Sequence, residues 1–305
     1  MAKSKIYGKK PVISVIIPVY NDKKYLDEAI QGILNQTFRD FELILVNDAS
    51  TDNSLEIMRK YQKKDKRIII INNKKNLMTS RSRNKALKIA KGKYVAMQDH
   101  DDFSFPERLE KEYNFLEKNP DSFMVSCTAL FVDVNGKFIF RIVNFFIEKL
   151  VHSVFSELPK KFISIFPLLV IHSSIMFRNT GQVFYRPKMI YSEDYDLHLR
   201  SISSGLKVSF IPETLVTYRL SLGMTSAKHF KIEGIMTAKA REFYRQRINT
   251  GKDDYSSFDP NSFIKDYENR KHSISEIISY YIFLFFGFSL NKILTHRNKK
   301  YEKAE

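Results

Sequence analysis

Three acidic side chains follow one short apolar segment, and they are the residues of this chain best suited to chemistry. Tyr94–Met97 has the pattern of a buried strand, and Asp99, Asp101 and Asp102 come directly after it. Carboxylates released together at a strand end repel one another unless a cation lies among them. A hard divalent ion, bound by oxygen atoms and shared with a phosphate, meets that need. The segment predicts an enzyme that handles a metal–diphosphate substrate; a solvated turn that caps the helix beginning near Pro106 is the alternative.

Asp48 stands at the end of a second apolar segment, residues 41–46. A carboxylate at a strand end can accept a hydrogen bond from the ring N–H of a nucleobase, which would select a pyrimidine such as uracil. An Asx-turn or a helix cap is the alternative role, and that role suits Asp52 better. From its position alone, Asp48 fits both descriptions equally well.

A pair of acids, Glu193 and Asp194, precedes a segment in which Leu197, Leu199 and Arg200 recur at helix-like spacing. Paired acids before a helix can supply a general base, because burial and the neighbour's charge raise the pKa of one of them. Acids at a helix N-terminus are also favoured by the helix dipole alone. The spacing by itself favours this second, structural role.

Two arginines and one histidine are weaker candidates for a site. Arg81 and Arg83 lie just before a helical segment, and a guanidinium group suits phosphate oxygens, but both are equally plausible as solvated surface charges. His172 lies in an apolar run, where a histidine is more often a hydrogen-bonded core residue than a ligand. None of the three is decisive by itself.

The elements that must position these side chains alternate between strand and helix patterns. Apolar runs rich in β-branched residues predict strands at residues 12–17, 41–46, 67–71 and 94–97. Apolar residues at helical spacing predict helices between them, the first capped by Asn21 or Asp22. This order predicts an α/β fold with a mostly parallel central sheet flanked by helices. Ligands of such sheets gather beyond the carboxyl ends of the strands.

Further along the chain the pattern is less regular. Strands are predicted at residues 128–132, 137–142 and 171–177. After residue 226 the sequence becomes helical and charged. We therefore expect a main domain at residues 1–226 and a helical C-terminal extension at residues 227–305.

Composition and motifs argue against several classes of protein. The 305 residues, 43% of them apolar, suffice for one core with an appendage, and the single cysteine, Cys127, allows no intrachain disulfide. The chain lacks a G-x-G-x-x-G fingerprint and a Walker A loop, which argues against a nicotinamide enzyme and a P-loop kinase. Its net charge of +16 is spread along the sequence without a nucleic-acid-binding motif, so no nucleic acid partner is expected.

Residues 277–290 contain no charged side chain and many aromatic ones, and a basic stretch follows them. This segment is shorter than the roughly 18–20 apolar residues that a membrane-spanning helix needs. An aromatic helix with a basic flank can lie in a membrane interface, which predicts peripheral membrane contact. Packing on the main domain or on a second subunit is the equal alternative. Residues 1–10 are basic but no apolar stretch follows, so no signal peptide is expected.

Nine segments, taken in their order along the chain, resemble the family 2 glycosyltransferases, which are inverting bacterial sugar transferases with the GT-A fold. Each segment is weakly diagnostic, but nine in the order of the family are specific, and they lie within residues 11–226. The segments are residues 14–21, 29–38, 41–52, 83–87, 91–94, 99–102 with 106–109, 173–178, 193–197 and 218–219.

The resemblance implies a nucleotide-sugar site. Asp48 would contact the nucleobase, with Pro18 and Tyr20 in the same nucleotide-binding loop. Arg83 and Glu193 would belong to the site that binds the nucleotide sugar. The donor would be a nucleotide diphosphate sugar, and a UDP-linked donor is expected.

The resemblance also implies a metal site and a base. Asp99 and Asp101 would form a D-x-D motif that holds Mn²⁺ or Mg²⁺ with the nucleotide sugar, and Asp194 would deprotonate the acceptor hydroxyl. Two positions depart from the family. Asn47 stands where the family often has the first of two acids, and Ser221 stands where the family commonly has a histidine, so the contribution of that histidine is absent.

The sequence therefore predicts an inverting glycosyltransferase that adds a sugar to a hydroxyl of a growing surface glycan. Lipopolysaccharide, capsule and exopolysaccharide are the expected glycan classes, the acceptor being a glycan or a lipid-linked glycan. The expected location is the cytoplasm, at the inner face of the membrane. A catalytically silent nucleotide- or glycan-binding module of the same fold is the alternative. A nucleotidyltransferase is less compatible, because residues 18–21 contain neither the glycine nor the basic residue of its usual loop.

Overall fold

The computed structural model describes two compact units, formed by residues 10–140, 171–221 and 228–269. The sheet unit comprises, among these, residues 10–129, 171–184 and 208–217. The helical unit comprises residues 130–140, 185–207, 218–221 and 228–269. Residues 226 and 277–290 lie outside the described residues, so the domain boundary and the aromatic segment expected there stay predictions.

Four parallel strands form one half of the sheet, in the order β3-β2-β1-β4. All residues of β1, β2 and β4 are buried, as expected for parallel strands covered on both faces. The predicted α/β fold is confirmed, and each strand lies within two residues of its expected position. The strands are β1 (Ile13–Val19), β2 (Phe41–Asn47), β3 (Ile68–Asn72) and β4 (Tyr94–Met97).

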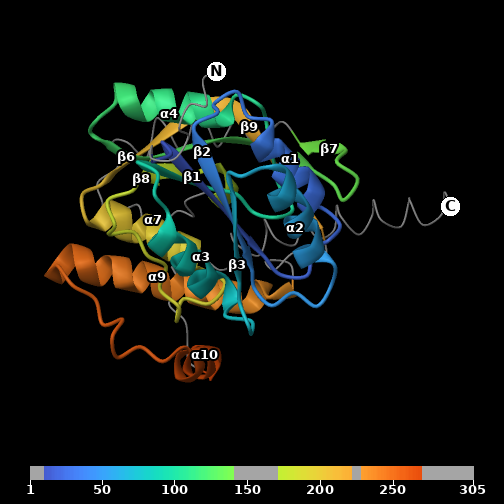
Figure 1. Cartoon of the computed structure of the whole chain (residues 1–305). Helices are drawn as coiled ribbons and strands as arrows, with labels where there is room; N and C mark the ends of the chain where they lie inside the picture. The colour runs from blue at the N-terminus through green and yellow to red at the C-terminus, as the bar shows by residue number, and fades with distance from the viewer. Residues whose placement is uncertain (1–9, 141–170, 222–227, 270–305) are drawn as a thin grey trace, which may run out of the picture. The chain divides into compact units, whose positions relative to one another are not determined.

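The helices that connect these strands lie on both faces of the sheet (Figure 1). α1 (Leu26–Leu34) and α2 (Ser54–Lys64) pack together on one face, and α3 (Met78–Ile89) packs against β1 and β2 on the other. Right-handed crossovers require this arrangement, because the chain steps from β1 to β3 in one direction and returns to β4 in the other. The carboxyl ends of all four strands therefore share one edge.

The other half of the sheet is antiparallel, so the sheet is mixed. β4 pairs with β8 (Met176–Arg178), β8 pairs with β6 (Ser122–Val132), and β9 (Lys207–Arg219) pairs with β5 (Phe103–Ser104). β6 and β9 are neighbours in the sheet. The chain continues from β5 into α4 (Arg108–Lys118).

Two local predictions were wrong. The first half of the strand expected at residues 171–177 is instead the 3₁₀ turn η1 (His172–Ser174), because Ser174 Oγ donates to the carbonyl oxygen of Ile171 at 2.7 Å. α1 begins at Leu26 without a cap from Asn21 or Asp22. These two residues are engaged elsewhere: Asn21 Oδ1 accepts from the N–H of Thr51, and the N–H of Asp22 donates to Ser54.

One glycine fixes the contact between β1 and the start of β4. A Cβ atom on Gly92 would lie 2.5 Å from the main-chain nitrogen of Ser14, so no other residue fits without a shift of the backbone. The Ser14 hydroxyl donates to Glu42 at 2.6 Å and accepts from the Gly92 N–H at 2.9 Å. This buried contact joins β1 and β2 to the residues that lead into β4.

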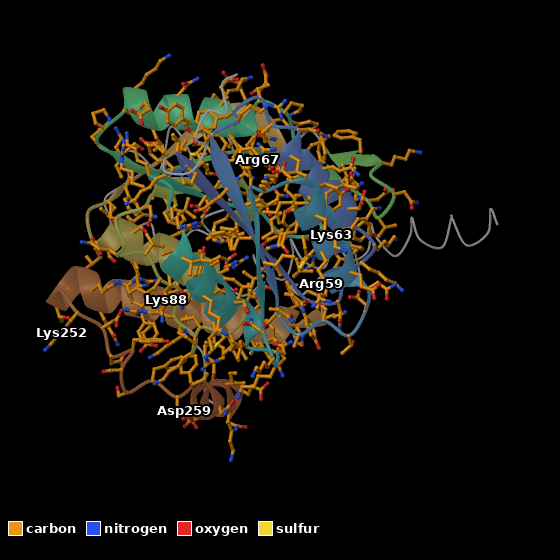
Figure 2. The ribbon with its side chains drawn as sticks, viewed as in Figure 1. Arg59, Lys63, Arg67, Lys88, Lys252 and Asp259 are labelled. Carbon is orange, nitrogen blue, oxygen red and sulfur yellow. The ribbon has the colours of Figure 1, made fainter. Side chains whose placement is uncertain are left out.

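Basic side chains lie on the outer surface on both sides of the sheet. Arg59, Lys60, Lys63 and Lys64 are exposed on α2, and Lys88 is exposed on α3; Figure 2 marks three of them. α2 and α3 cover opposite faces, so these charges do not form a single stripe. The distribution agrees with the spread of charge seen in the sequence.

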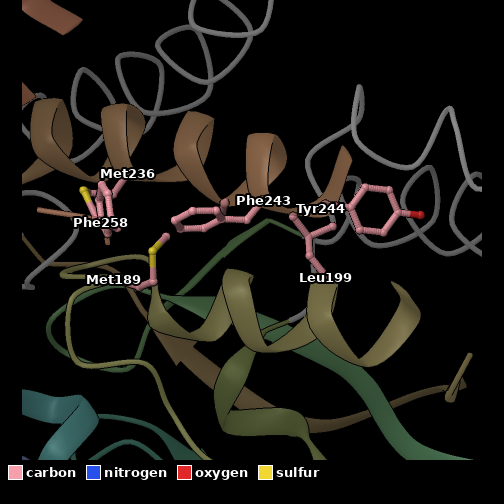
Figure 3. Packing of buried hydrophobic residues seen from close by; sticks show 7 residues of the cluster. Met189, Leu199, Met236, Phe243, Tyr244 and Phe258 are labelled. Carbon is pink, nitrogen blue, oxygen red and sulfur yellow. The ribbon is translucent and has the colours of Figure 1, made fainter. Parts of the chain in front are cut away.

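The helical unit is built around α7 (Glu193–Ser203) and α9 (Phe230–Thr250), which pack on each other. Its core contains Met189, Leu199, Met236, Phe243, Tyr244 and Phe258 (Figure 3). α9 ends at Gly251, whose φ of 78° forms a left-handed cap, and α10 (Pro260–Asn269) follows. β7 (Phe138–Phe140) pairs with Phe131 and Val132 at the end of β6.

Among the described residues, no helix combines the length and the apolar character needed to cross a membrane.

Candidate active site

Asp48 is held at the carboxyl end of β2 by two hydrogen bonds to the same carboxylate oxygen. Asn73 Nδ2 and the N–H of Leu77 each donate to Asp48 Oδ1 at 2.9 Å. Asp48 is only 4% exposed. Within the described residues no hydrogen bond reaches Asp48 Oδ2. One oxygen is thus fixed by the protein, and the other is available to an N–H donor of a ligand.

The Asp48 side chain is supported by a second layer of contacts through Asn73. Asn73 Nδ2 also donates to Ser82 Oγ at 2.9 Å, and Lys85 Nζ donates to Asn73 Oδ1 at 2.7 Å. Both partners lie on α3. The sequence did not single out Asn73; its position after β3, at the edge where ligands gather, was the available signal.

The loop after β1 lies against the loop after β2. Pro18 is buried in β1, and Tyr20 follows that strand with 47% of its side chain exposed. The N–H of Lys23 donates to Asp52 at 3.0 Å, and Asn21 adopts a positive φ of 53°. These contacts hold the two strand-end loops together and leave the ring of Tyr20 open to solvent.

The three acids after β4 are not equivalent. Asp102 is 2% exposed, and its Oδ2 atom accepts from Ser173 Oγ at 2.5 Å. The same hydroxyl accepts from the N–H of Asp99 at 3.1 Å. The side chains of Asp99 and Asp101 are 28% and 23% exposed. Asp102 therefore fixes the loop from inside, and the other two carboxylates face a wetter environment.

Arg83 and Asp99 form an ion pair. Arg83 Nη2 lies 2.8 Å from Asp99 Oδ1, and its side chain is 5% exposed. The sequence suggested that Arg81 and Arg83 lie before the helix, but both lie within α3. Arg81 is exposed. The structure thus brings one of the two arginines to the acidic loop.

His100, inside the acidic loop, carries positive charge at neutral pH. Its Nδ1 atom donates to Asp22 Oδ2 at 2.6 Å and lies 4.0 Å from Asp101 Oδ1. Burial lowers the pKa of His100, but the hydrogen bond to Asp22 and the charge of Asp101 outweigh it and raise the pKa to about 9. Sequence reasoning missed this pair, because the partners are far apart in the chain.

Asp101 lies among like charges, which is the electrostatic situation that a bound cation relieves. Burial raises the pKa of Asp101; the charge of His100 opposes this, and those of Asp99 and Asp22 add to it. No group of three acidic, histidine or cysteine side chains in the described residues is arranged to hold a metal. Mg²⁺ commonly binds one or two carboxylates together with substrate phosphates, so Asp99 and Asp101 fit a cation that arrives with a diphosphate.

The second pair of candidate acids lies at the start of α7 in the helical unit. Glu193 is buried and Asp194 is half-buried, and Asp194 Oδ1 accepts from the N–H of Tyr195 at 2.7 Å. Just before the helix, Tyr191 adopts a positive φ of 60° and its ring stacks on His229 at 4.1 Å. A bulky residue in this conformation is strained, and the stacked ring helps to hold it.

Five charged side chains anchor the same helix in the interior of the helical unit. Asp196 is fully buried and lies 2.9 Å from Arg200 and 3.8 Å from Arg186. Asp253 lies 2.8 Å from Arg186 and also pairs with Arg247. Burial acts to raise the pKa of Asp253, but the hydrogen bonds from the two arginines outweigh it and lower the pKa. The network joins α7 and α9 to the loop after α9.

Comparison with known proteins decides the family. The model of the family "Glycosyl transferase family 2" matches residues 14–177, which contain Asp48, Asp99 and Asp101. The chain belongs to this family. It is a glycosyltransferase.

His172, whose role the sequence did not decide between a core residue and a ligand, is buried in η1.

Two relatives place this family 2 glycosyltransferase among others of its kind. An uncharacterised glycosyltransferase of Methanocaldococcus jannaschii is 40% identical over 215 residues, which are 69% of this chain and 71% of that protein. The UDP-Glc:alpha-D-GlcNAc-diphosphoundecaprenol beta-1,3-glucosyltransferase WfaP of Escherichia coli is 31% identical over 226 residues, which are 72% of this chain and 82% of that protein.

Solved structures share the fold of this glycosyltransferase. The mannosyltransferase PcManGT of Pyrobaculum calidifontis, in complex with GDP-Man and Mn²⁺, matches with a TM-score of 0.61 at 16% identity, over 95% of this chain and 80% of that chain. TarS 1-349 of S. aureus, in complex with UDP-GlcNAc, matches with a TM-score of 0.57 at 18% identity, over 91% and 81%. At these identities the likeness establishes the GT-A-like fold alone.

Proposed function

We propose that the protein moves a hexose from a UDP-linked sugar to an acceptor hydroxyl on a surface glycan under assembly, with inversion at the anomeric carbon. The observation that carries the proposal is the arrangement at the strand-end edge of a family 2 glycosyltransferase. There, Asp48 keeps one oxygen available, and the acidic loop presents Asp99 and Asp101 while Asp102 is tied down.

The nucleotide would be held by the strand-end loops of the sheet unit. Asp48 Oδ2 accepts the ring N–H of uracil, which distinguishes this base from one that has an acceptor there. Pro18 and Tyr20 border the same loop, and the exposed ring of Tyr20 offers an apolar surface to the nucleoside. Arg83, which pairs with Asp99, belongs to the nucleotide-sugar site.

Asp99 and Asp101 would hold Mn²⁺ or Mg²⁺. Such a cation, when bound, stabilises the charge that develops on the departing diphosphate. The crowding of negative charge around Asp101 supports this assignment. That PcManGT was solved with Mn²⁺ and GDP-Man agrees with a metal-dependent donor site in this fold.

Asp194 would act as the base, and Glu193 would contact the sugar. Asp194 accepts the proton of the acceptor hydroxyl as that oxygen attacks the anomeric carbon from the face opposite the diphosphate. The product then has the inverted configuration. The start of α7 supports the role, because the buried ion pairs behind it hold the helix in place.

The proposed acceptor is a lipid-linked glycan of lipopolysaccharide, capsule or exopolysaccharide assembly. WfaP, whose name specifies a diphosphoundecaprenol-linked acceptor, supports this class. The net charge of +16 and the aromatic segment at residues 277–290 support peripheral contact with the inner face of the cytoplasmic membrane. Pelleting with anionic vesicles tests the contact: the full chain should pellet and a chain ending at residue 274 should not, and equal recovery in the supernatant would contradict it.

A catalytically silent module of the same fold is the alternative that the sequence left open. Retention of both Asp101 and Asp194 favours the enzyme, because a decayed enzyme has no need to keep them.

Slow hydrolysis of the donor tests the proposed function without knowledge of the acceptor. The protein is incubated with Mn²⁺ and a panel of nucleotide sugars, and release of nucleotide diphosphate is measured. We expect release from a UDP-linked sugar, and its loss in Asp101→Ala. Binding of UDP without any release would favour the silent module, and neither binding nor release with any donor would contradict both candidates.

A further inference from the structure

We propose that Gln98 is a positioning residue for the acidic loop, and that Arg108 and Ser104 hold Gln98 in place. Gln98 follows β4 directly and is fully buried. It lies in the sheet unit immediately before Asp99. The inference rests on the proposed function only for the identity of the ligand that the loop binds.

The Gln98 side chain closes the loop through its main-chain atoms. Its Nε2 atom donates to the carbonyl oxygen of Asp99 at 3.2 Å and to that of Asp102 at 2.7 Å. These two carbonyls lie at the first and last residues of the acidic segment. The single amide group therefore fixes the spacing of the loop ends through main-chain atoms and not through the carboxylates of Asp99 and Asp101.

The other end of the Gln98 amide is fixed just as firmly. Gln98 Oε1 accepts from Ser104 Oγ at 2.6 Å and from Arg108 Nη1 at 3.0 Å. Arg108 is fully buried, and its Nη2 atom donates to the carbonyl oxygen of Met97 at 2.8 Å. Its Nε atom pairs with the buried Glu112 at 3.0 Å. Both polar ends of the Gln98 amide and all three side-chain nitrogens of Arg108 have hydrogen-bond partners, which makes the arrangement rigid.

The chemistry of the amide suits this place. An acidic loop that binds a cation must keep its carboxylates at a fixed spacing despite their repulsion. A neutral side chain that donates to two carbonyls does this without adding charge next to Asp99. Ser173 fixes the loop from the other side through the Asp102 carboxylate, so Gln98 and Ser173 act on different atoms.

Gln98→Met tests the proposal, because methionine keeps the length of the side chain and removes both polar ends. A matched control is Gln36→Met. Gln36 is also fully buried and donates to the main-chain carbonyls of Gly32 and Phe105, with a longer contact of 3.5 Å to that of Ser104, but it has no hydrogen bond to residues 99–102 or to Gln98. Both variants should lose stability to a similar extent in urea unfolding.

The decisive readout is Mn²⁺-dependent binding of UDP by calorimetry. Removing a residue that orients metal ligands typically weakens metal affinity about 10- to 100-fold, so Gln98→Met should raise the Kd of UDP in Mn²⁺ by at least about tenfold. Gln36→Met should leave it within about twofold of wild type. Equal Kd values for the two variants would overturn the proposal.

Hydrogen exchange gives a readout that needs no ligand. Gln98→Met should speed exchange at the N–H group of Asp102, whose carbonyl Gln98 binds. Gln36→Met should instead speed exchange at Leu109, whose N–H donates to Gln36 Oε1 in the wild-type protein. Unchanged exchange at Asp102 in Gln98→Met would overturn the proposal. Failure of the wild-type protein to bind nucleotide would contradict the proposed function instead, and the exchange measurement would still test the proposal.

Ser104→Ala is the milder variant in case Gln98→Met does not fold. It removes one donor to Gln98 Oε1. We expect the same faster exchange at Asp102 with a smaller effect, and normal exchange there would count against the proposal.

Discussion

The acidic loop of the sheet unit and the acidic start of α7 in the helical unit are held by different forces. Hydrogen bonds of neutral groups fix the main chain and the buried end of the loop: Gln98 binds two of its carbonyls and Ser173 binds Asp102, while ion pairs reach its partly exposed side chains, Asp99 and His100. Ion pairs between buried arginines and carboxylates hold α7, with Asp196 and Asp253 at their centre. Behind α7 lies an apolar core shared with α9.

The difference follows from what each acid has to do. If Asp99 and Asp101 share a cation, they must stay ionised and close together, and the hydrogen bonds of Gln98 to the main chain of the loop can hold their spacing without adding a charge. A base at a helix start needs only a stable helix behind it, and a buried ion-pair network supplies that at a distance from the reacting atoms. We expect changes in the sheet unit to affect binding of the donor, and changes in the helical unit to affect turnover or stability.

The largest expected effect is that of Asp194→Asn on turnover. Loss of a general base typically lowers the rate about 10²- to 10⁴-fold, and we expect a drop in that range for sugar transfer. The Kd of UDP should stay unchanged, since the residues proposed to bind the nucleotide and the metal, Asp48, Asp99 and Asp101, lie in the sheet unit. Steady-state kinetics and calorimetry measure the two quantities. Near-normal turnover would remove Asp194 from the role of base.

Asp253→Ala should destabilise the helical unit. It leaves Arg186 and Arg247 buried without the carboxylate that now pairs with both, and breaking a buried pair in this way costs about 3 kcal/mol. Urea unfolding measures the loss. The matched control is Asp254→Ala, where the side chain is 52% exposed and the cost should be below about 1 kcal/mol. Equal losses would show that the buried network contributes little.

Glu112 should make the stability of the sheet unit depend on pH. Burial raises the pKa of Glu112 to about 7, with Arg108 opposing the rise. Between about pH 4.5 and about pH 7 the folded state keeps a proton that the unfolded state releases, so the contribution of Glu112 to stability falls as pH rises through this window.

Urea midpoints of wild type and Glu112→Gln, measured at about pH 5 and about pH 8, test that sign. Wild type should lose stability relative to the variant on going to the higher pH. Parallel profiles would mean that Glu112 titrates at its ordinary value in the folded protein.

Ala49→Gly should have the smallest effect, and a stabilising one. Ala49 follows Asp48 with a positive φ of 60°, which costs an L-residue about 1–2 kcal/mol; the freedom of glycine in the unfolded chain offsets about half of that. We expect a gain of up to about 1 kcal/mol in urea unfolding. Ala90→Gly, at a φ of −60°, is the control and should lose stability. A loss at both positions would contradict the strain assigned to Ala49.

The strands and the edge where the candidate residues gather could be predicted from the sequence. β1 to β4 are short β-branched runs bounded by turn residues, and their period identifies them without any knowledge of the fold. The parallel order then places the residues after each strand at one edge. Asp48 and the acidic loop follow from that alone.

What could not be predicted depends on contacts between distant parts of the chain. Ser173 ties down Asp102 from 71 residues away, and Asp22 pairs with His100 from 78 residues away. The expected cap at Asn21 failed for the same reason, because the loop after β2 had already engaged that side chain. The roles of Asp99, Asp101 and Asp194 stay predictions, which mutation can test.

Calorimetric titration of UDP in the presence of Mn²⁺ tests most directly the claim that the acidic loop binds a cation shared with the donor's diphosphate. Wild type and Asp194→Asn should bind with similar Kd values, and Asp101→Ala should lose the Mn²⁺-dependent part of the affinity. Equal binding by all three proteins, with and without Mn²⁺, would contradict the account.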